Sequence, residues 1–124
     1  MMFLLTLRAY LLLLSFETLF ARHDFANLHR RVRQRPVRQP KPGITTDHIC
    51  RATNLASALY FKEVQCLQRS AALVCLLRTS GIPALLVIGA QRLPFRAHAW
   101  AEAYGRVVND SDSTVELYGV LDRL

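Results

Sequence analysis

Residues 64–83 read VQCLQRSAALVCLLRTSGIP, and this stretch decides how the rest of the chain is arranged. From Leu67 to Leu77 it is mostly apolar, and it stops at Gly81, with Pro83 just beyond. Glycine after the last helical turn and proline soon after it are stop signals for a helix. A helix of about four turns that is apolar on nearly every side lies in the middle of a domain. We therefore expect a buried central helix here.

Cys66 stands at the start of this predicted helix. Free backbone N–H groups and the positive end of the helix dipole gather at a helix start, and both stabilise a thiolate. Cys75 lies in the middle of the same helix among leucines, where a thiol stays protonated and inert. The sequence therefore makes Cys66 the candidate nucleophile and Cys75 its internal control.

The composition limits the kinds of site that the chain can hold. Its 124 residues suffice for one small core, and its three cysteines contain no C-x-x-C pair. Cys66 and Cys75 are nine positions apart, so they face opposite sides of a helix and cannot share a metal. We expect reduced thiols, no metal, no cofactor and a cytoplasmic location.

Residues 1–21 are strongly apolar, but Arg8 and Glu17 interrupt the run. The positive charge inside the run and the lack of a clear small-x-small cleavage site disfavour a signal peptide. Two charges within about 20 residues also make a membrane span costly. We expect a buried or partner-covered helix, with a membrane-associated helix as the alternative.

Residues 22–43 hold the basic part of a chain whose net charge is +7. Three prolines in their second half predict an extended linker after a short helical stretch. The aromatic interleaving and recognition motifs of nucleic-acid binders are missing, so we expect no nucleic-acid partner. We divide the chain into residues 1–43, an apolar helical segment with a basic proline-rich linker, and residues 44–124, the domain that carries the chemistry.

Residues 45–61 have the pattern of an amphipathic helix that a threonine or an aspartate at residues 45–47 can cap. We interpret His48 and Cys50 as ordinary residues of its first turns. A buried strand is predicted for residues 84–90 by their length, their branched side chains and the flanking proline and glycine.

Residues 97–104 alternate strictly between alanine and a larger residue. The four alanines face one side of a strand, which leaves room for the central helix, and His98 faces the other. Gly105 predicts a tight hairpin turn, and we expect the return strand to begin with residues 107–110. Helices followed by an antiparallel sheet make this an α+β fold.

The length of this hairpin turn decides which acid partners His98. A three-residue loop places Asp112 opposite His98 and makes Asp110 a diagonal neighbour on the same face. A two-residue loop sends Asp110 to the other face, because the side chains of a strand alternate. Spacing alone therefore allows Asp110 or Asp112.

A thiol at a helix start, a histidine on a strand and an acid on the next strand form a Cys-His-Asp arrangement. Cys66 would attack a carbonyl carbon, His98 would carry the proton, and the acid would orient the imidazole. One oxyanion donor would be the Cys66 N–H, and the candidates for the second are Gln65 and a backbone N–H near it. Spacing alone also fits a chance cysteine and a structural histidine.

Five blocks of residues occur in an order that resembles a known family, the lasso-peptide leader peptidases of the transglutaminase-like, papain-related superfamily. The resemblance covers about residues 47–120. The blocks are Cys66-Leu67-x-Arg69-Ser70, Leu76-Leu77-Arg78-x-x-Gly81-Ile82-Pro83-Ala84, Val87-Ile88-Gly89, Pro94-Phe95-x-Ala97-His98-Ala99-Trp100-x-Glu102 and Val107-Val108-Asn109-Asp110.

The resemblance implies a cysteine peptidase that removes the leader from a ribosomally made lasso-peptide precursor. It assigns Cys66 as nucleophile, His98 as base and Asp110, in preference to Asp112, as the acid. It also implies three partners: the precursor peptide, a separate leader-recognition protein and an ATP-dependent cyclase. The chain resembles the stand-alone form of this peptidase. No family motif marks its first 43 residues, which we expect to dock partner proteins or the membrane.

Two other functions fit the same residues. A transglutaminase-type acyl transferase would form the same thioester but resolve it with an amine instead of water. A non-catalytic scaffold of a peptide-maturation complex would carry the three residues without using them.

Overall fold

The computed structural model describes residues 2–92, 94–111 and 113–124. Four helices come first and a four-stranded antiparallel sheet follows, so the expected α+β arrangement is confirmed. The elements in chain order are α1 (Met2–Ala21), α2 (Phe25–Gln34), α3 (Thr46–Leu59), α4 (Cys66–Thr79), β1 (Ala84–Gln91), β2 (Arg96–Ala103), β3 (Arg106–Val107), α5 (Thr114–Leu117) and β4 (Gly119–Arg123).

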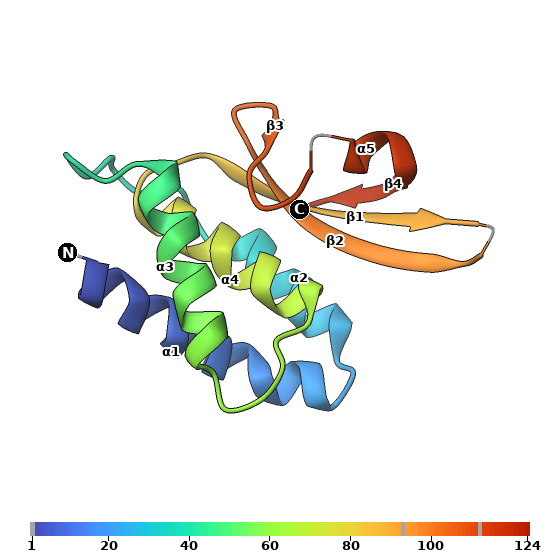
Figure 1. Cartoon of the computed structure of the whole chain (residues 1–124), viewed down its shortest axis with the longest axis horizontal. Coiled ribbons are helices and arrows are strands. Elements are labelled where there is room, and N and C mark those ends of the chain that lie inside the picture. Colours follow the sequence, from blue (N-terminus) through green and yellow to red (C-terminus); the bar gives the residue numbers. More distant parts are fainter. Residues whose placement is uncertain (1, 93, 112) are drawn as a thin grey trace.

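The helices α1 to α4 gather on one side and the strands on the other, with α4 between the remaining helices and the sheet (Figure 1). Every residue of α4 from Ser70 to Arg78 is buried. Helix α4 packs on β1 and β2 with one side and on α1 and α3 with another, which is why it is apolar almost all round.

The stop signal at Gly81 works as expected. Gly81 has a φ of +88°, and the N–H of Ile82 donates to the carbonyl of Leu77 at 2.9 Å, which closes the helix end. The extended segment after α2 crosses directly over this turn. A Cβ added at Gly81 would lie 2.3 Å from Cα of Pro40, so this close approach requires glycine.

The alanine face of β2 meets the core as expected. Ala99, Ala101 and Ala103 are buried in the same apolar cluster as the leucines of α4, whereas Ala97 is exposed at the start of the strand. The small side chains let the helix lie close to the strand.

The hairpin between β2 and β3 has the shorter of the two possible loops. Ala103 pairs with Arg106, and Tyr104 and Gly105 both have positive φ, at 53° and 76°. Two such residues form the turn whose twist matches that of the strands. Strand β3 ends at Val107, so the return strand expected over residues 107–110 is shorter than predicted.

The far edge of the sheet was not expected. Helix α5 leads into β4, which pairs with β1 and gives the strand order β3-β2-β1-β4. Apolar and polar residues alternate too weakly in the sequence after Asp110 to predict a strand. Strand β4 is therefore defined by its pairing with β1.

Helix α1 is half inside the fold. Leu5, Ala9, Leu13 and Phe16 are buried, and all but Leu5 lie in the same core cluster as α4. The opposite side of α1 is exposed and still apolar. By length and composition α1 is able to span a membrane, with 22% of its most apolar window buried, but a core helix passes the same test.

Candidate active site

Cys66 is the first residue of α4, as the sequence predicted. Its N-cap, Gln65, makes no side-chain capping hydrogen bond, so the first N–H groups of α4 are not occupied by that side chain. Cys66 is half-buried and lines a small cavity together with His98. The other residues that line this cavity are Leu67, Ile88, Ala97 and Ala99.

His98 lies near the start of β2, opposite Gly89 of β1. Its Nε2 contacts Oδ2 of Asp110, and its ring packs against Tyr118 and Trp100 at centroid distances of 5.2 and 5.9 Å. Because Asp110 engages Nε2, Nδ1 is the ring nitrogen left for another partner. The structure therefore brings His98 and Asp110 together, and it sets His98 and Cys66 on one cavity.

Asp110 is held as a carboxylate by its neighbours. Partial burial raises its pKa, but hydrogen bonds from His98 and from the Ser111 N–H, the latter at 2.7 Å, together with one from Thr114 outweigh burial. The net result is a pKa below the ordinary value of an aspartate. Asp110 is therefore ionised near neutral pH and able to stabilise a charged imidazole.

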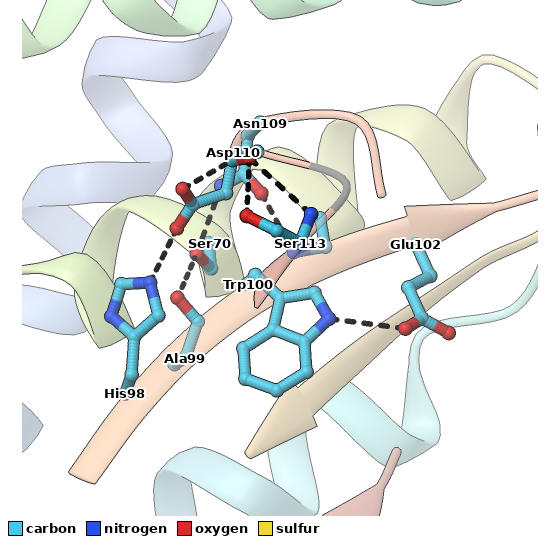
Figure 2. Close-up of polar contacts among 10 residues, drawn as sticks. Ser70, His98, Ala99, Trp100, Glu102, Asn109, Asp110 and Ser113 are labelled. Atoms are coloured by element: carbon cyan, nitrogen blue, oxygen red, sulfur yellow. Dashed lines mark hydrogen bonds and ion pairs between the residues drawn. The ribbon is translucent and has the colours of Figure 1, made fainter. Parts of the chain in front are cut away.

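Asp110 reaches His98 because the strand ladder ends early. With the two-residue loop, continued pairing would set Asp110 opposite Ala99, on the alanine face. Instead, the N–H of Ala101 donates to Oδ1 of Asn109 at 2.8 Å, β3 ends at Val107, and Asp110 contacts His98 (Figure 2). For a two-residue loop, strand alternation predicted that Asp110 would lie on the face away from His98. The loop does have two residues, yet Asp110 contacts His98. Asp112 lies outside the described residues.

The ring of His98 rests on a packed support that sequence reasoning missed. Trp100 is fully buried, and its Nε1–H donates to Oε2 of Glu102 at 3.0 Å. A Cβ on Gly89 would lie 2.8 Å from the Trp100 ring and 3.0 Å from Tyr118, so the missing side chain lets these rings approach. The sequence did contain a sign of this close approach, because a glycine inside an apolar strand often marks a place where another group packs closely. Nothing in the sequence pattern predicted that Tyr118 would contact His98, because only the pairing of β4 with β1 brings it here.

The other cysteines lie apart from this cavity. Burial raises the pKa of Cys75, and burial with the nearby Asp47 charge raises the pKa of Cys50 to about 11. His48 belongs to a capping box with Thr45, whose Oγ1 accepts from the His48 N–H at 3.2 Å. These residues therefore have ordinary structural roles. Within residues 2–92, 94–111 and 113–124, no group of three or more His, Cys, Asp or Glu is placed to hold a metal.

Comparisons with known proteins agree with this architecture. The model of the transglutaminase-like superfamily matches residues 10–123. The microcin J25-processing protein McjB of Escherichia coli is 39% identical over 56 residues, which are 45% of this chain and 27% of McjB. The chain thus matches about a quarter of the length of that relative. No solved structure matches the chain.

Proposed function

Because this chain belongs to the transglutaminase-like superfamily, we propose that it is a cysteine peptidase that removes the leader peptide from a lasso-peptide precursor. The observation that carries the proposal is the contact between His98 and Asp110 beside the cavity of Cys66. The similarity to a lasso-peptide processing protein supports the choice of substrate. Members of one superfamily catalyse different reactions, so the site carries the argument for the chemistry.

In the first half-reaction, Nδ1 of His98 takes the proton of the Cys66 thiol, and the sulfur attacks the carbonyl carbon of the scissile peptide bond. Asp110 keeps the imidazole oriented through Nε2 and stabilises its charged form. The N–H groups at the start of α4 face the developing oxyanion, with the Cys66 N–H as one donor and the Gln65 side chain as a candidate second. The proton on Nδ1 then passes to the departing amine, which leaves a thioester on Cys66.

In the second half-reaction, His98 takes a proton from water, and the resulting hydroxide attacks the thioester carbonyl. The carbon–sulfur bond breaks, the leader leaves with a carboxylate, and Cys66 regains its proton. Water therefore ends as part of the released leader. An acyl transferase would use an amine in place of water, so the product distinguishes the two reactions.

We propose three partners for this reaction: the precursor peptide as substrate, a separate leader-recognition protein that delivers it, and an ATP-dependent cyclase that acts on the released core. We also propose that residues 1–43 and 44–124 have separate functions, because Cys66, His98 and Asp110 all lie in the second part. We place the reaction in the cytoplasm. Membrane association through residues 1–21 is a further proposal, supported by the exposed apolar side of α1.

The test is cleavage of a lasso-peptide precursor from the chain's own gene neighbourhood, with the leader-recognition protein present, followed by mass spectrometry. We expect a shorter peptide from the wild type and from Cys75→Ala, and none from Cys66→Ala. A new amide linkage would establish transfer in place of hydrolysis. Equal loss in the two folded variants, or full activity in Cys66→Ala, would refute the assignment of the nucleophile.

A further inference from the structure

Three hydrogen bonds form a polar bridge behind the candidate site, which we call the Ser70–Asn109 bridge. Oδ1 of Asn109 accepts from the Ala101 N–H at 2.8 Å, and Nδ2 of Asn109 donates to Oγ of Ser70 at 3.0 Å. The Ser70 hydroxyl in turn donates to the carbonyl of Ala99 at 3.2 Å. Ser70 and its bond to Ala99 are buried, and the two bonds of Asn109 are partly buried; Figure 2 shows Ser70 between Ala99 and Asn109.

Each end of the bridge lies beside one of the three candidate residues. Ser70 comes one turn after Cys66 on the same side of α4. Ala99 directly follows His98, and Asn109 directly precedes Asp110. The bridge thus ties together the helix, the strand and the loop that carry the nucleophile, the base and the acid.

We propose that Asn109 is a positioning residue that, through Ser70, holds Asp110 against His98 and sets both relative to Cys66. This inference rests on the proposed peptidase function. Without the Asn109 side chain, the Ala101 N–H would pair with a main-chain carbonyl, as it does in a continuing ladder. That register would set Asp110 opposite Ala99, on the face away from His98. The amide of Asn109 therefore ends the ladder at the position where Asp110 must turn.

The bridge requires an amide at this position. One side chain must accept a hydrogen bond from the Ala101 N–H and donate one to Ser70 Oγ, and the amides of Asn and Gln carry a carbonyl oxygen and an NH₂ group on the same carbon. A carboxylate at residue 109 offers acceptors alone, and alanine offers neither. The Ser70 hydroxyl likewise accepts and donates at once, so its removal leaves buried polar groups unpaired.

The test compares Asn109→Ala, Ser70→Ala and the double variant in cleavage of the same precursor. We expect kcat to fall about 10- to 100-fold in each, because small displacements of reacting groups cost that much, with KM nearly unchanged. The double variant should lose no more than the single variants, since the two residues act as one unit. The pH dependence of kcat should shift as well, because His98 loses its fixed carboxylate partner.

Thr53→Val is the matched control. Thr53 is almost fully buried, and its hydroxyl donates to the Ile49 carbonyl at 2.9 Å, so this bond stays within α3 and takes no part in the bridge. It should lose folding stability, as the bridge variants do, but keep the wild-type kcat and pH profile. Bridge variants that match Thr53→Val in kcat and pH profile would overturn the proposal.

A second measurement does not depend on catalysis. Nitrogen-15 NMR of the histidine rings reports which nitrogen of His98 carries the proton and how it titrates. We expect Asn109→Ala to change the His98 signals and Thr53→Val to leave them as in the wild type. The two proposals fail on different results. If the wild-type chain cleaved no precursor, the proposed function would be wrong. If Asn109→Ala left the His98 signals unchanged, the positioning role of Asn109 would be wrong.

Discussion

His98 shows how much of the candidate site is decided at single residues. Its ring has Asp110 at Nε2, Tyr118 and Trp100 packed against it, and the cavity of Cys66 alongside. A ring held on three sides has few rotamers to choose from, which reduces the entropy lost on reaching a reactive geometry. The carboxylate of Asp110 adds the charge that an imidazolium needs. Asp110 therefore contributes both charge and orientation, and Tyr118 and Trp100 contribute to orientation alone.

Replacing Asp110 by Asn separates these contributions. We expect precursor cleavage at neutral pH to fall about 10²- to 10⁴-fold, the range of general acid–base catalysis, because an amide cannot stabilise imidazolium.

Since folding lowers the Asp110 pKa from its ordinary 3.8, the ionised carboxylate stabilises the fold above that pH. The advantage of the wild type over Asp110→Asn in unfolding free energy should therefore shrink below that pH and vanish once the folded carboxyl is protonated. Urea titrations from pH 7 down to pH 2 would measure it, and a constant difference would contradict the assignment.

Helix α4 performs different tasks at its two ends. Its start presents Cys66 with free N–H groups, and its end is tied to the rest of the chain. Arg78, in the last turn, is buried and donates to the carbonyls of Val32, Ala84 and Leu124. One guanidinium thus joins α2, β1 and the end of the chain to α4, and charge-assisted bonds of this kind are among the stronger ones in proteins. The fixed end of α4 thus helps to hold its start, which carries the proposed nucleophile, against the sheet.

Gly81→Ala tests how tightly this end is held. The substitution should destabilise the fold by more than the roughly 1–2 kcal/mol of a positive φ alone, because the new Cβ meets the backbone of Pro40. Gly43→Ala is the control, since Gly43 also has a positive φ, +78°, but an added Cβ there meets nothing within 4 Å. Thermal unfolding of both variants would show the difference. Equal losses in the two would mean that the segment around Pro40 moves aside freely.

One apolar core is shared by the first helix and the part of the chain that holds the proposed catalytic residues. Side chains of α1 and α2 lie in the same apolar cluster as α4 and the alanines of β2. Tyr60 and Gln68 also donate to Glu17 of α1, at 2.9 and 3.1 Å, and Lys62 forms an ion pair with it at 2.8 Å. These contacts give the Glu17 carboxylate polar partners within a mostly apolar helix and lower its pKa, with the Lys62 hydrogen bond as the largest cause.

Two phenylalanines of α1 test this shared core. Phe16→Ala should lower the unfolding free energy by about 3–5 kcal/mol, because Phe16 is fully buried. Phe3→Ala should change it by no more than about 0.5 kcal/mol, because Phe3 is 81% exposed. Chemical denaturation of both variants would check the pair. A negligible loss in Phe16→Ala would mean that residues 44–124 fold without α1.

Much of this fold, and its resemblance to a family, could be predicted from short-range patterns in the sequence. The start and stop of α4, the strand at residues 84–91 and the alanine face of β2 depend on neighbours a few positions apart. Such patterns are legible in a sequence because helix and strand periodicities repeat locally. The resemblance to lasso-peptide leader peptidases is confirmed by the family match and by the similarity to McjB.

Folding in three dimensions settled the features that depend on distant partners. Strand β4 exists because β1 pairs with it, and Tyr118 reaches His98 only through that pairing. The turn at Tyr104–Gly105 would by alternation alone have turned Asp110 away, and a single side-chain amide reversed that outcome. Periodicity describes a strand while it continues, but it does not say where a competing side chain ends the ladder, because that depends on a hydrogen bond across the fold.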